Sequence, residues 1–212
     1  VRAIIVTGAG PKAFAAGTDI AQFRAFKSPK DGLDYEARID VILSQIERCP
    51  VPMIAAISGA CTGGGAAISA CCDMRLGTRD MRYGFPIART LGNCLSAKSL
   101  QRLIGLIGAP RVTDLVFSSR LLSGDECLSA GLVTELVEDH AALMARANAL
   151  AQQIAGFAPL TISTTKELMR RIREAQPTID DHDLVAKVYT SADFREGLEA
   201  FLAKRKPAWS GK

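Results

Sequence analysis

Two short loops of small residues carry the pattern with the clearest chemical meaning. The first spans residues 12–20 (KAFAAGTDI) and the second spans residues 59–67 (GACTGGGAA). Each loop follows an apolar run and precedes a segment of helical pattern, and small side chains let a ligand approach the backbone closely. The first amides of a helix lack intrahelical partners and point outward. Such amides bind an anion, or an oxygen that becomes anionic during a reaction.

Three other kinds of structure also use glycines in similar patterns. Either loop alone fits close packing of a helix against a strand, where glycine is favoured. A phosphate-binding P-loop needs Lys and Ser or Thr after its glycines, but two alanines follow Gly65. Residues 8–13 fit a permissive dinucleotide-binding pattern, G-x-G-x-x-A, yet residues 11–17 have the composition of a loop where that fold needs a helix. The sequence therefore disfavours both kinds of nucleotide site.

Composition argues against several further classes of function. The net charge is only +4 over 212 residues, with no basic stripe, so no nucleic-acid partner is expected. The uncharged stretch 49–72 is broken by prolines and glycines, so it predicts a strand, a turn and a helix rather than a membrane span. Six cysteines without a CxxC pair predict reduced thiols and a cytoplasmic protein. Two histidines without further ligands predict no metal site.

Strands and helices alternate along most of the chain. Apolar runs predict strands at 3–7, 51–57, 74–78, 82–85 and 132–137, the first of them buried on both faces. Helical patterns cover 33–48, 66–70, 97–107, 110–118, 124–130, 140–156, 161–175 and 193–206. In the first helix, Leu33, Ala37 and Val41 share a face, while Asp19 and Glu126 suit the starts of two other helices. The alternation predicts an α/β fold with mostly parallel strands.

The two loops, the stretch 123–133 (SGDECLSAGLV) and the end pattern from Asp193 to Pro207 together resemble the crotonase superfamily, also called the enoyl-CoA hydratase/isomerase family. The resemblance covers nearly the whole chain. It implies a spiral of ββα repeats with the acyl-CoA pocket in residues 1–135, and a C-terminal helical trimerisation region in 136–212. A homotrimer or a dimer of trimers is then expected. The family has about one further strand–strand–helix unit before Val1, so we expect a preceding segment.

The same resemblance assigns roles to particular residues. The substrate would be an acyl-CoA thioester, with coenzyme A as part of the substrate and no separate cofactor. Its carbonyl oxygen would lie between the backbone N–H groups of Thr18 and Gly64, which would stabilise an enolate. The resemblance places the coenzyme A portion along Lys12, Ala13 and Ala16, and brings Phe201 and Lys204 from a neighbouring subunit.

The chain departs from the family pattern where hydratases carry two glutamates. Those positions hold Ala67 and Ile87, which line the expected pocket but cannot transfer protons. The following loop offers Arg89 for a substrate carboxylate, Asn93 for orienting water or a carbonyl, and Cys94 as a nucleophile. We therefore expect decarboxylation, C–C cleavage or isomerisation rather than simple hydration. The alternative is a noncatalytic acyl-CoA-binding or structural homologue.

Overall fold

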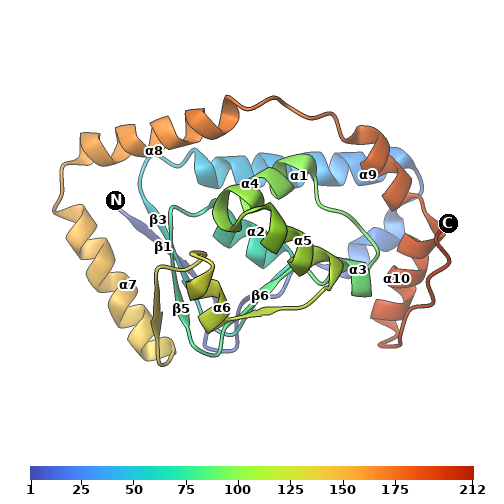
Figure 1. The fold of residues 1–212 in the computed structure, drawn as a ribbon, viewed down its shortest axis with the longest axis horizontal. Helices are drawn as coiled ribbons and strands as arrows, with labels where there is room; N and C mark the ends of the chain where they lie inside the picture. Colours follow the sequence, from blue (N-terminus) through green and yellow to red (C-terminus); the bar gives the residue numbers. More distant parts are fainter.

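The computed structural model describes residues 1–212 and arranges their strands in two four-stranded sheets (Figure 1). The first sheet has the order β1–β3–β5–β8 and is wholly parallel, with strands Ile4–Thr7, Met53–Ile57, Met74–Thr78 and Glu135–Val137. The second sheet has the order β2–β4–β6–β7, with strands Ala13–Ala15, Ala60–Thr62, Arg82–Gly84 and Leu122–Ser123. In this sheet only the β6–β7 pair is antiparallel. The predicted α/β class with mostly parallel pairing is confirmed.

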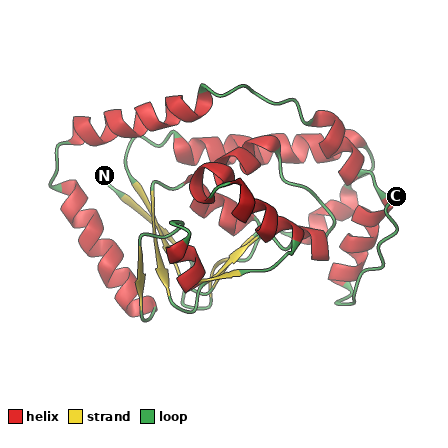
Figure 2. Ribbon diagram, in the orientation of Figure 1, coloured by secondary structure: helices red, strands yellow, loops and turns green.

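Helices surround the two sheets (Figure 2). They are η1 (Ile20–Ala25), α1 (Pro29–Glu47), α2 (Gly64–Cys71), α3 (Ile87–Thr90), α4 (Ala97–Ile107), α5 (Ala109–Phe117), α6 (Gly124–Ser129), α7 (His140–Ala155), α8 (Pro159–Glu174), α9 (His182–Tyr189) and α10 (Ala192–Leu202). None of them has both the length and the apolar character needed to cross a bilayer. All six cysteines are free thiols.

The two strands of each successive pair enter different sheets. The strands β1, β3 and β5 enter the first sheet, and the strands that directly follow them, β2, β4 and β6, enter the second. A helix follows each pair, as the ββα spiral requires. Because β2 and β4 run parallel, with Ala13 opposite Ala60 and Ala15 opposite Cys61, their carboxyl ends meet at one edge. This pairing brings the two small-residue loops together.

An aromatic cluster fixes the C-terminal helices α9 and α10 against η1 and α1 of the same chain. The ring of Phe23 lies 5.0 Å from that of Tyr35 and 5.6 Å from that of Phe194, while Tyr189 lies 4.8 Å from Phe194. All four side chains are buried. In contrast, α8 contributes no buried residue.

A buried ion pair in the C-terminal half of α1 fixes this helix against α4. Arg102 Nη2 lies 3.0 Å from Glu47 Oε2, and its Nη1 lies 3.1 Å from Asp40 Oδ1. Since α1 is held at both ends of its inward face, the side chains along that face have fixed positions relative to the sheets.

Several short elements differ from the predictions. The strands β2, β4 and β7 and the helices α3 and α9 were not predicted, because two- to four-residue strands and single helical turns leave no readable period. Strand β1 is only partly buried, because it lies at a sheet edge rather than between two strands. The face of α1 predicted from Leu33, Ala37 and Val41 is also wrong: Val41 is 59% exposed, and the buried residues of α1 include Tyr35 and Leu43.

The start of α6 carries the expected acidic residue in a reciprocal cap. Ser123 Oγ accepts a hydrogen bond from the Glu126 N–H at 3.3 Å, and Glu126 Oε2 accepts one from the Ser123 N–H at 2.8 Å. The Ser123→Ala variant should lose about 1 kcal/mol of unfolding free energy, measured by urea denaturation. The Ser163→Ala variant changes a half-buried serine within α8 that caps no helix, and it serves as the control. Equal stability of the two variants would contradict the capping role.

Candidate active site

The two small-residue loops lie against each other at the edge where β2 and β4 end. The hydroxyl of Thr62 donates a hydrogen bond to the carbonyl oxygen of Ala16 at 3.1 Å and ties the loops together. Gly17 and Gly63 take φ values of 123° and 54°, which few other residues adopt. A Cβ atom built on Gly64 would lie 3.7 Å from the backbone nitrogen of Thr18. The first turn of α2 therefore faces the Thr18 amide.

The amides of Thr18 and Gly64 are available to a ligand. The Thr18 N–H makes no hydrogen bond within the protein, although the Thr18 hydroxyl accepts one from Gln22 at 2.9 Å. Gly64 is exposed and is the first residue of α2, so its N–H has no acceptor inside the helix. The preceding N–H, of Gly63, is already bound to the Gly84 carbonyl at 3.0 Å. Two neighbouring donors at a helix start suit one anionic oxygen.

A cavity of about 640 Å³ opens beside these amides and is lined mainly by apolar side chains. This volume falls in the range usual for sites that hold small molecules. Of the residues singled out in the sequence, the lining includes Ala16, Thr18, Gly64, Ala67, Ile87, Asn93, Cys94 and Phe201. It does not include Lys12, Ala13, Arg89 or Lys204. The structure thus brings the expected amide donors to one cavity with Ala67 and Ile87, the positions where the resemblance led us to expect glutamates.

Arg89 was a candidate from the sequence, but it does not line the cavity. The residues after Pro86 form the one-turn helix α3 instead of the expected loop. In that turn Ile87 is buried and lines the cavity, while Arg89 is exposed. Arg89 therefore has no place to hold a substrate carboxylate inside this cavity.

Phe201 lies at the cavity of its own chain, which differs from the expectation. The resemblance led us to expect that a neighbouring subunit would supply this side chain. In the structure, Phe201 and Leu202 of α10 line the cavity of their own chain. The aromatic cluster of η1, α1, α9 and α10 explains this placement, because it folds α10 back over its own core.

Asp19 and Cys94 also line the cavity. Asp19 Oδ1 accepts a hydrogen bond from the Ala21 N–H at 3.0 Å, so the expected cap of η1 is confirmed. Burial raises the pKa of the Cys94 thiol to about 12, so almost no thiolate is present at neutral pH.

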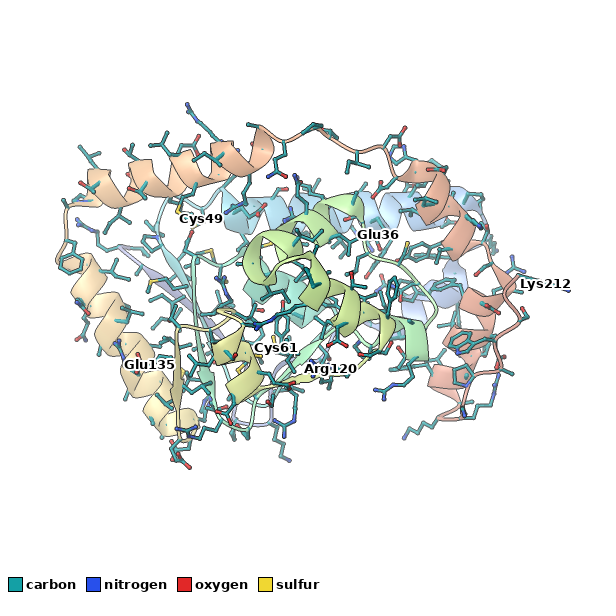
Figure 3. The ribbon with its side chains drawn as sticks, in the orientation of Figure 1. Glu36, Cys49, Cys61, Arg120, Glu135 and Lys212 are labelled. Carbon is teal, nitrogen blue, oxygen red and sulfur yellow. The ribbon has the colours of Figure 1, made fainter.

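Glu36 is a cavity-lining residue that the sequence pattern did not predict. It lies on the inward side of α1 (Figure 3), where Tyr189 Oη donates a hydrogen bond to Glu36 Oε1 at 2.6 Å. Burial raises the pKa of Glu36 to about 7, against the lowering effect of the Tyr189 hydrogen bond. The wrong phase assigned to α1 hid this residue. The sequence signal for Glu36 is its spacing: it follows Tyr35 directly and precedes Ile39 by three residues, which puts Glu36 and Ile39 on one helix face.

Comparison with known proteins agrees with this geometry. The family model described as enoyl-CoA hydratase/isomerase matches residues 1–212. A short-chain-enoyl-CoA hydratase of Clostridium acetobutylicum is 31% identical, over 97% of this chain and 79% of the relative. The structure of methylmalonyl-CoA decarboxylase in complex with 2-nitronate-propionyl-CoA matches with a TM-score of 0.91 at 28% identity, over 100% of this chain and 82% of the other. An enoyl-CoA hydratase/carnithine racemase from Magnetospirillum magneticum matches with a TM-score of 0.78 at 31% identity, over 100% and 79%.

Proposed function

Because this chain belongs to the enoyl-CoA hydratase/isomerase family, we propose that it binds an acyl-CoA thioester with the carbonyl oxygen between the N–H groups of Thr18 and Gly64. The observation that carries this proposal is the approach of Gly64 to the Thr18 amide at the cavity edge. Both N–H groups then stabilise the oxygen as it gains negative charge. One such donor typically contributes a factor of about 10²–10³ in rate.

The reaction that we propose is one that reaches a thioester enolate without the two usual glutamates, with decarboxylation as the leading candidate. In a carboxylated acyl-CoA, the bond from the α-carbon to the carboxylate breaks and CO₂ leaves. The electron pair of that bond then forms the enolate held by Thr18 and Gly64. Ala67 and Ile87 line the cavity without any exchangeable proton, which disfavours hydration. The similarity to a methylmalonyl-CoA decarboxylase supports the same choice.

We place the coenzyme A portion along the first loop and at the chain end. Lys12 and Lys204 are both exposed and cationic, as contacts for phosphate groups require. Ala13 and Ala16 have side chains small enough to let the nucleotide lie along the backbone. This arrangement leaves the apolar interior of the cavity for the acyl group.

We also propose that residues 136–212 form the oligomer contact, in a trimer or a dimer of trimers. The supporting feature is α8, which has no fully buried residue and exposes Leu160, Leu168, Met169 and Ile172. Covering such a group of apolar side chains is favourable. Sedimentation analysis of the protein gives the number of subunits directly.

A small panel of substrates tests the proposed reaction. We expect CO₂ release from malonyl-CoA or methylmalonyl-CoA and no hydration of crotonyl-CoA, followed by mass spectrometry of the products. A 3-oxoacyl-CoA in the panel detects C–C cleavage. Crotonyl-CoA hydration at ordinary rates would show that another residue supplies the proton transfers. Tight calorimetric binding without turnover of any member would favour a noncatalytic acyl-CoA-binding protein.

A further inference from the structure

We infer that Glu36, held in place by Tyr189, transfers protons to and from the α-carbon of the bound acyl-CoA. This inference rests on the proposed function, since it needs an enolate at Thr18 and Gly64 to act upon. It assigns to α1 a task that the family pattern would have given to positions 67 and 87.

The first argument comes from the groups that line the cavity. Its only two carboxylates belong to Asp19 and Glu36. The Asp19 carboxylate caps η1 through the Ala21 N–H. Glu36 uses Oε1 for Tyr189, while its Oε2 accepts no hydrogen bond from the protein. Both carboxylates keep one oxygen free of hydrogen bonds, but Asp19 is exposed to solvent whereas Glu36 is half-buried, so Glu36 is the carboxylate better shielded from water.

The second argument is that the chain fixes the position of Glu36. Tyr189 is buried, and its ring packs against that of Phe194 at 4.8 Å. Gly32, one turn before Glu36, lets this tyrosine approach α1: a Cβ atom there would lie 2.5 Å from the Tyr189 Cβ. Asn93 adds a buried oxygen, Oδ1, that has no partner within the protein. Buried polar atoms normally find partners, so a held carboxyl beside an unused acceptor points to a ligand.

The surroundings of Glu36 suit a group that both donates and accepts protons. It faces Asp40 on its own helix, Asp181 just before α9, Tyr189 on α9 and Cys94 in the loop before α4. Burial is the main cause that raises the Glu36 pKa to about 7, and the two aspartates add to it. Near neutral pH both the acid and the carboxylate are thus populated, as general acid–base catalysis requires.

The proton transfer balances in both directions. After CO₂ leaves, the electron pair of the enolate forms a C–H bond with the proton of the Glu36 carboxylic acid, which becomes a carboxylate. Solvent then returns a proton to Glu36. In reverse, the carboxylate removes an α-proton from the saturated acyl-CoA, and the enolate forms at the same two amides.

The reverse direction provides the test, because it needs no decarboxylation. Propionyl-CoA is incubated with the full chain in D₂O, and mass spectrometry follows deuterium at the α-carbon. The wild type should exchange, with a rate that rises with pH through about 7 as Glu36 ionises. The Glu36→Gln variant keeps an acceptor for Tyr189 and should exchange about 10²-fold more slowly. The Glu135→Gln variant is the matched control and should exchange normally, because Glu135 on β8 does not line the cavity and lies far from Glu36 (Figure 3).

The Tyr189→Phe variant separates proton transfer from a structural role. Loss of its hydrogen bond should raise the Glu36 pKa further and move the pH midpoint of exchange upward. Wild-type exchange that persists in Glu36→Gln, with the same pH profile, would overturn the inference while leaving the amide donors in place. Absence of both exchange and turnover in the wild type would instead overturn the proposed function itself.

Discussion

Replacing Gly64 with proline should lower the turnover of an acyl-CoA substrate by about 10²–10³-fold, the usual effect of losing one donor to a developing oxyanion. Proline has no N–H, so this substitution removes the donor itself. The position tolerates the ring unusually well, because Gly64 is the first residue of α2 and proline is favoured at the first helical position. The expected loss should lie mainly in kcat, since the N–H is needed most when the oxygen becomes negative.

The Gly64→Ala variant is the matched control for this experiment. Its added Cβ would lie 3.7 Å from the Thr18 nitrogen, which is ordinary contact, and the amide N–H remains. Circular dichroism and calorimetric titration with coenzyme A check that both variants fold and bind. Equal turnover in the proline and alanine variants would remove Gly64 from the proposed donor pair.

Restoring both glutamates, as Ala67→Glu with Ile87→Glu, should create hydration of crotonyl-CoA. Both positions line the cavity that holds the proposed donors, and each general acid or base typically contributes about 10²–10⁴-fold. The combined gain over the wild type should therefore reach about 10⁴-fold, measured by loss of the enoyl absorbance. Ile87 is only 8% exposed, so burial should raise the pKa of a glutamate placed there and favour its acid form.

The corresponding pair of glutamines, Ala67→Gln with Ile87→Gln, has nearly the same size but transfers no protons. Hydration by the glutamate pair and not by the glutamine pair would establish proton transfer as the missing component. Failure of a folded glutamate pair that still binds coenzyme A would contradict the assignment of positions 67 and 87.

The sequence predicts the parts of this site that depend on the main chain. Small residues at 12–20 and 59–67, each before a helical pattern, predicted two loops of backbone donors, and the family resemblance then singled out Thr18 and Gly64. The structure places these two residues together because β2 and β4 pair in parallel. Neither strand can be recognised in the sequence, since the three-residue strands Ala-Phe-Ala and Ala-Cys-Thr are too short to show a period.

Side chains that enter the cavity were harder to predict. The direction of Arg89 depends on a single helical turn, in which a shift of one residue turns a side chain by about 100°. Glu36 depends on the rotation of α1, which is set by packing against Tyr189 and Arg102 from distant parts of the chain. Such long-range contacts leave no mark on local hydrophobic spacing.

The hydrogen-bonded pairing of β2 with β4 has a consequence for the evolution of such a protein. The proposed thioester contacts are amide groups, so they persist through most amino-acid replacements. The proposed acyl end of the cavity is built from side chains on α1, α2, α3 and the loop before α4, each replaceable by a point mutation. Replacements of these side chains can thus change the reaction of the acyl group without changing how the thioester carbonyl is bound. A lineage can exchange one reaction for another at positions such as 67, 87 and 36 while the carbonyl-binding frame stays intact.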